Sequence, residues 1–287
     1  MIELTQSGRN RKGICLTTEG DHRVKSVAVD AKPDFHVVSL RYKLLPSDRV
    51  TYVSPPPVEF EEEEVRFRLA DGKLTCEMKT HFPTVEAARA VVERILRAWE
   101  ADADLRWNQG ELGFKFDRAE VIDGSPLPPG VIRVHVQGAA ATFAVGTVSV
   151  HVSRNHYPEP PGTFRLNPDA ESLLLRYQGY LGGREPLLSM AYFSYTVLTA
   201  NAPGNGRRKR AASKYRIHVD VLRKMGDLTS CRGDRSTARK AAAAGQPLTD
   251  PESAWLQAAV KTLIWRLGDT HSATVLPLIT LSDLPRL

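Results

Sequence analysis

The chain has 287 residues, of which 42% are hydrophobic and 25% charged, a balance that fits a folded globular protein and excludes a disordered or fibrous one. This length can bury a sizeable core and predicts two domains. The net charge is +6, yet residues 203–246 contain twelve Lys and Arg against three Asp, so the rest of the chain sums to −3. Such a concentrated basic segment indicates a polyanionic partner.

Residues 1–161 predict a sheet-rich α+β domain that recognises a ligand or partner. Asp71-Gly72 is a hairpin signal, because Gly and Asp accept the left-handed backbone of a tight turn. A single helix is expected over Thr84–Glu100, where apolar residues recur with a period near 3.6 and Thr84 can cap the first turn. Short runs rich in β-branched and aromatic residues predict the strands: Val24–Val29, Phe35–Leu45, Val65–Leu69, Leu74–Met78, Gly113–Phe116, Val131–Val136 and Phe143–Val152.

Two proline-rich stretches interrupt the pattern. The stretch 156–162 contains three prolines and a glycine, and we place the domain boundary there, at residue 161. The prolines at 55–57 precede an acidic run at 59–64, which is interpreted as a solvated edge or, alternatively, as a docking patch for the basic segment.

Residues 162–287 predict an all-α domain of five helices that carries the basic segment. Asn167-Pro168 and Gly182 bracket the first helix, and the second runs from about Glu185 to Ala200. Thr249 to Glu252 has the form of a capping box that starts the fifth helix, and Gly268 can stop that helix. The third helix is expected over Ile217–Leu228 and carries an apolar stripe. The fourth is short and covers Arg235–Ala244. The tail, Thr274–Leu287, is expected to lie across the bundle or add an edge strand.

The basic segment offers two groups of cations that suit phosphate contacts. The first group is expected on a flexible Gly-rich loop, and the second on and before the short fourth helix, where Arg235 and Arg239 lie one turn apart. Little aromatic interleaving is present, so backbone contact with weak sequence preference is expected. The alternative is a solvated loop with no partner. The candidate nucleic-acid-binding residues are Arg207, Arg208, Lys209, Arg210, Arg232, Arg235, Arg239 and Lys240.

The candidate catalytic residues are Arg266 and His271, which follow the pattern Arg, four residues, His at the end of the last long helix. This pattern in an all-α segment, over roughly Asn167–His271, resembles the HEPN family of small helical ribonucleases. The resemblance implies that the two side chains meet at a dimer seam and cleave RNA without a metal, in a bacterial toxin or antiviral system. An Arg can stabilise charge on phosphate, and a His can move the 2′-hydroxyl proton. Alternatively, Arg266 caps the helix and His271 is an ordinary loop residue.

Other sites have weaker support. Arg154-Asn155-His156 is interpreted as a polar site between domains or as an interdomain hydrogen-bond cluster. His135 and His151 lie in neighbouring predicted strands but lack a third metal ligand. No phosphate-binding loop, dinucleotide fingerprint, serine-hydrolase elbow or zinc-protease motif is found. No metal or other cofactor is therefore expected.

The cellular setting is expected to be the cytoplasm. The first residues show no secretory signal, and the most apolar long segment, Leu187–Ala202, is too short and too polar to span a bilayer. Cys15, Cys76 and Cys231 are odd in number and widely spaced, which is typical of free thiols in a reducing compartment.

Two functions are therefore weighed. The first is an RNA- or DNA-binding protein, with HEPN-like ribonuclease activity as its catalytic form. The alternative is a non-enzymatic interaction or regulatory module, whose basic helical domain binds an acidic protein partner or forms a homodimer.

Overall fold

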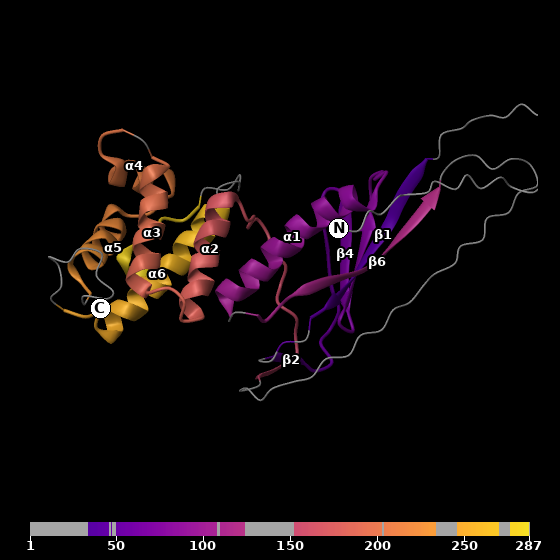
Figure 1. Ribbon diagram of the computed structural model, residues 1–287, viewed down its shortest axis with the longest axis horizontal. Helices are drawn as coiled ribbons and strands as arrows, with labels where there is room; N and C mark the ends of the chain where they lie inside the picture. The colour runs from indigo at the N-terminus through magenta and orange to yellow at the C-terminus, as the bar shows by residue number, and fades with distance from the viewer. Residues whose placement is uncertain are drawn as a thin grey trace, which may run out of the picture.

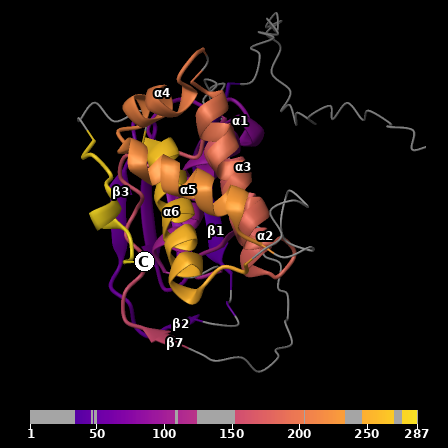
Figure 2. The same cartoon turned by 90° about the vertical axis from the view of Figure 1, so that its left-hand side faces the viewer.

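The computed structural model describes residues 34–45, 47, 50–107, 110–123, 152–202, 204–233, 246–269 and 276–286. An antiparallel sheet and one long helix form the N-terminal part, and the later helices pack together beyond that helix (Figures 1 and 2). The predicted α+β fold class is confirmed. The strands predicted at 24–29 and 131–136, most of the one at 143–152, and the helix at 235–244 fall outside the described residues.

The sheet has the strand order β3-β4-β5-β1-β6, and all neighbours are antiparallel. The predicted hairpin joins β4 to β5, and Asp71 and Gly72 have φ angles of 50° and 69°, which a tight hairpin turn of this kind requires. Strands β2 and β7 form a small parallel pair outside this sheet. The strands span Phe35–Leu44 (β1), Val50–Tyr52 (β2), Val58–Glu61 (β3), Val65–Ala70 (β4), Lys73–Met78 (β5), Phe114–Asp123 (β6) and Val152–Arg154 (β7).

Three carboxylates of the acidic run, those of Glu59, Glu61 and Glu62, form ion pairs. Glu62 accepts two hydrogen bonds of 2.9 Å from Arg165, which joins the sheet to the start of the helical part. Glu61 pairs with Arg66 and Lys79 at 2.7 and 3.2 Å. These contacts favour the interpretation of the run as a sheet edge over that of a docking patch.

The helical part contains α2 to α6 among the described residues. Asn167 caps α2 as expected, and its side-chain amide also donates to the carbonyl of Leu267 at the end of α6. The capping box of Thr249 and Glu252 is formed at the start of α6. The helices span Pro168–Leu181 (α2), Leu187–Ala200 (α3), Arg207–Lys214 (α4), Val219–Cys231 (α5) and Asp250–Gly268 (α6).

The prediction of a flexible loop for Arg207–Arg210 is wrong, because these residues form the first turn of helix α4. Arg, Lys and Ala are good helix formers, and the buried Ala211, Ala212 and Tyr215 anchor this helix to the core. The predicted third helix also starts later than expected. Ile217 precedes α5 and instead pairs with Ile279 of the tail, which lies on the helical core as expected.

Helix α1, Val85–Arg106, joins the two hydrophobic cores. Thr84 caps it as predicted, but it continues six residues beyond the expected end at Glu100. Trp99 is fully buried among sheet residues, and its indole N–H donates to the carbonyl of Pro158. Ala98, Ala101 and Leu105 belong instead to the core formed by the later helices. Helix α1 therefore packs side chains into both the sheet core and the core of the later helices.

A buried carboxylate lies where α1 meets α6. The Asp102 side chain is 1% exposed and 2.9 Å from Nε of Arg106, whose guanidinium lies 4.7 Å from the ring centroid of Trp265. Burial raises the pKa of Asp102 to about 6, against the attraction of Arg106. Asp102 thus binds its proton more tightly in the folded than in the unfolded chain.

We expect Asp102→Asn to remove a pH dependence of stability. Because the folded pKa is raised, the contribution of Asp102 is most favourable below about pH 4 and is lost as the pH rises through 6. The two-unit difference corresponds to about 3 kcal/mol at neutral pH. Urea unfolding of both proteins between about pH 4 and pH 8 checks this, and parallel stability curves would contradict it.

Gly268 ends α6 as expected, but it also permits close packing. A methyl group there would lie 2.2 Å from Cε2 of Phe164 and 3.0 Å from the carbonyl oxygen of Arg165. The two backbones also bond to each other here, since the backbone amide of Arg165 donates a hydrogen bond to the carbonyl oxygen of Gly268.

Gly268→Ala is therefore expected to destabilise the protein by about 1–3 kcal/mol through overpacking. Gly179→Ala in α2 is the matched control, because its methyl group would meet nothing closer than 3.8 Å and alanine favours helix. Thermal unfolding should show a lower midpoint for the first variant alone. Equal midpoints would refute the packing role.

Candidate nucleic-acid interface

Helix α4 presents the first group of predicted cations. It begins after Gly206, whose φ is 75°, and no side chain caps its free amide groups. Its first four residues are all Arg or Lys, and its first turn contains no acidic residue. The N-terminus of a helix already carries partial positive charge, so these cations repel both it and one another. The arrangement is electrostatically unfavourable until an anion is nearby.

The four cations do not play the same role. Arg208 is half-buried, donates to the hydroxyl of Tyr195 at 3.1 Å and lies 5.7 Å from that ring centroid, so it anchors α4 to α3. Arg207 and Lys209 are exposed and make no ion pair with any residue the structure describes. Arg210 is exposed beside Gly204, where a methyl group would lie 2.2 Å from its guanidinium.

Two further exposed cations continue this surface. Lys214 at the end of α4 donates to the carbonyl of Asn201, and Arg216 donates to that of Leu276. Both bonds leave the positive charge without a carboxylate. We define the α4 surface as Arg207, Lys209, Arg210, Lys214 and Arg216.

The second group of predicted cations is placed only in part. Arg232 follows α5 and forms a 2.8 Å ion pair with Glu252, the capping-box residue of α6. The pKa of Glu252 is lowered mainly by the backbone amide of Thr249 and further by Arg232. Arg232 thus holds two helix ends together rather than facing a ligand. Three members lie outside the described residues: Arg235, Arg239 and Lys240.

Arg266 lies in the last turn of α6, and its residue surface is only 7% exposed. Its Nη2 donates to the carbonyl of Pro277 at 2.8 Å, so it contacts the tail rather than capping its own helix. Burial lowers the pKa of its guanidinium. His271 lies outside the described residues, and the pairing of the two side chains stays a prediction.

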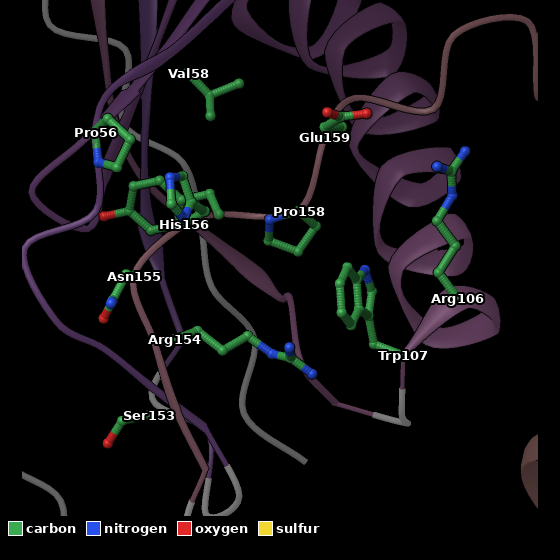
Figure 3. Close-up of a pocket in the computed structure, with 11 residues that line it drawn as sticks. Pro56, Val58, Arg106, Trp107, Ser153, Arg154, Asn155, His156, Pro158 and Glu159 are labelled. Carbon is green, nitrogen blue, oxygen red and sulfur yellow. The ribbon is translucent and has the colours of Figure 1, made fainter.

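A separate pocket of about 810 Å³ lies beside the end of α1 (Figure 3). Arg154 points toward Trp107 there, and its guanidinium is 4.2 Å from the ring centroid (Figure 3). Arg154 also donates to the buried Glu111 at 2.7 Å, while Asn155 and His156 line the pocket. The local sequence indicates the polar stretch 154–156 but not Trp107 or Glu111, which precede it by more than forty residues.

This pocket suits a phosphate backbone less well than the α4 surface does. Glu111 balances the charge of Arg154, and Asp102 balances that of Arg106. Glu159 adds a further carboxylate to the lining. Over the described part of the chain, no group of three or more His, Cys, Asp or Glu side chains could hold a metal ion.

Comparison with protein-family models, with curated proteins and with solved structures found no match. Among the helices of the described ranges, none is long and apolar enough to cross a membrane.

Proposed function

We propose that the chain binds the phosphate backbone of nucleic acid through the α4 surface. The observation that carries this proposal is the run of four cations in the first turn of a helix that has no capping side chain and no acidic residue in that turn. No Asp or Glu occurs between residues 186 and 219. Phosphate oxygens would offset the repulsion and accept from the free amides.

The surroundings favour backbone contact over base recognition. Two tyrosine rings lie against cations of helix α4: the half-buried Tyr195 lies beneath Arg208, and the buried Tyr215 lies beneath Lys214. An exposed aromatic platform, which stacks bases in many single-strand-binding proteins, is thus lacking among the described residues of this surface. RNA and DNA therefore both fit, with weak sequence preference.

Binding without cleavage is the form of the proposal that the geometry supports best. An Arg that stabilises a transition state must reach the phosphate, whereas Arg266 is buried and bonded to Pro277. The HEPN-like ribonuclease, its dimer and its bacterial antiviral setting in the cytoplasm remain predictions. A non-enzymatic role with an acidic protein partner is the competing function.

Arg207→Gln combined with Lys209→Gln is expected to weaken retention of single-stranded RNA. On a single strand, each lost phosphate contact should make the dependence of log affinity on log salt shallower by about 0.7, so the slope of the double variant should be shallower by about 1.4. Fluorescence anisotropy between about 50 and 200 mM salt measures this. The control, Arg66→Gln with Lys79→Gln, removes the same charge from cations already paired with Glu61. Equal slopes for the two variants would refute the proposal.

Catalysis is tested on the same RNA in EDTA with wild type and His271→Ala. Our proposal predicts retention of intact RNA by both proteins. Metal-free cleavage that His271→Ala abolishes would instead establish the ribonuclease. Arg266→Lys, which keeps the charge in its buried place, would then separate a catalytic Arg from a packing one.

A further inference from the structure

One face of the five-stranded sheet is covered by α1, and the described residues place no helix on the other face (Figures 1 and 2). Side chains alternate between the two faces of a strand. In β5, Leu74 and Cys76 are buried toward α1, so Lys73, Thr75 and Glu77 belong to the uncovered face. The strand register then fixes which residues share that face.

Two neighbouring rows of the uncovered face are cationic. The first row crosses β4, β5, β1 and β6. The second row crosses the same four strands at the neighbouring positions of the same face. Their members are Arg68, Thr75, Arg41 and Arg118 in the first row, and Ala70, Lys73, Lys43 and Lys115 in the second. We call these two rows the cationic sheet surface.

Like charges stand directly opposite one another in these rows. Arg41 faces Arg118, and Lys43 faces both Lys73 and Lys115. Directly opposed like charges destabilise a sheet. Sheets usually avoid such pairs, so their presence across three strands is informative.

The carboxylates nearby compensate for only part of this charge. Asp117 lies 2.6 Å from Lys43, and its pKa is lowered chiefly by Lys43 and further by Arg118 and Arg41. Glu59 lies 3.3 Å from Arg68. Four cations of the surface remain without an ion pair to any described residue: Arg41, Lys73, Lys115 and Arg118.

The next row of the same face shows the ordinary arrangement. Arg66 lies 3.8 Å from Glu77, its cross-strand neighbour, and 2.7 Å from Glu61. Further along the row, the Ser39 hydroxyl donates to Glu120 at 3.2 Å. The excess of positive charge therefore belongs to two rows and not to the whole face.

We propose that the cationic sheet surface is a second contact for the phosphate backbone of nucleic acid. The two rows contain no aromatic or large apolar side chain, so they provide neither a stacking platform for bases nor a pocket for the side chains of a peptide. A row of phosphates needs only cations at short spacing, and neighbouring strands supply one about every 5 Å. This inference takes the identity of the partner, nucleic acid, from the proposed function. The binding surface itself is made of residues separate from those of the α4 surface.

The test compares the two surfaces on one probe, a fluorescently labelled single-stranded RNA, with duplex DNA as the second probe. Lys73→Gln combined with Lys115→Gln should lower affinity about tenfold at 50 mM salt and make the salt slope shallower by about 1.4–1.8. Arg66→Gln combined with Lys79→Gln, which removes the same charge from paired cations, should change neither by a comparable amount. The same measurements are made on the α4 double variant, Arg207→Gln with Lys209→Gln, and on a quadruple variant that combines it with the sheet double variant.

Thermal unfolding separates a lost contact from a lost fold. Because Lys73 and Lys115 each face Lys43, the sheet double variant should be at least as stable as wild type at low salt. Weaker RNA binding by a protein of undiminished stability supports the inference. Weaker binding that is explained by unfolding overturns it.

The outcomes distinguish this inference from the proposed function. Weakening by both doubles, with a larger effect in combination, supports both surfaces. Weakening by the sheet double alone supports this inference and refutes the α4 surface, whereas weakening by the α4 double alone overturns this inference. Should wild type ignore both nucleic acids but bind polyglutamate through Lys73 and Lys115, the partner would be an acidic protein and the inference would fail.

Discussion

The structure depends on one helix that belongs to two cores. Helix α1 has 22 residues and is therefore about 33 Å long. Its first part lies against the sheet, but Ala98, Ala101 and Leu105 are buried among the later helices. Small side chains at two of these positions allow close approach. Separating the two parts would expose an apolar surface on α1 and the buried Asp102 together, so the helical part is held in place by the same element that completes the sheet.

Features set by neighbouring residues were predicted well. Thr84, Asn167 and Thr249 all cap the helices they were expected to cap, and Asp71-Gly72 forms the expected turn. Each depends on a side chain or a backbone angle within three or four residues, which the sequence displays directly. Such signals identify where elements begin, but they contain no information about what lies across the fold.

Features set by distant residues were predicted less well. The last turns of α1 are helical because later helices cover them, and no local pattern marks that. The first turn of α4 was expected to be a loop because charge and glycine dominate the local sequence. The burial of Ala211 and Ala212 against other helices decides the conformation instead. The same applies to the candidate site, since only the structure separates Arg208 and Arg232, which bond to neighbouring helices, from the exposed Arg207 and Lys209.

Charge counted along the chain and charge gathered in space give different pictures. The residues outside 203–246 have a net charge of −3, so a count of charges by segment assigns the whole positive excess to residues 203–246. Pairing of the strands brings Lys43, Lys73 and Lys115 into one row from three separate segments. Three acids of the 59–64 run, Glu59, Glu61 and Glu62, form ion pairs instead. A sheet can thus carry a cationic surface in a part of the chain whose net charge is negative. Strand register, rather than composition, is the property that reveals it.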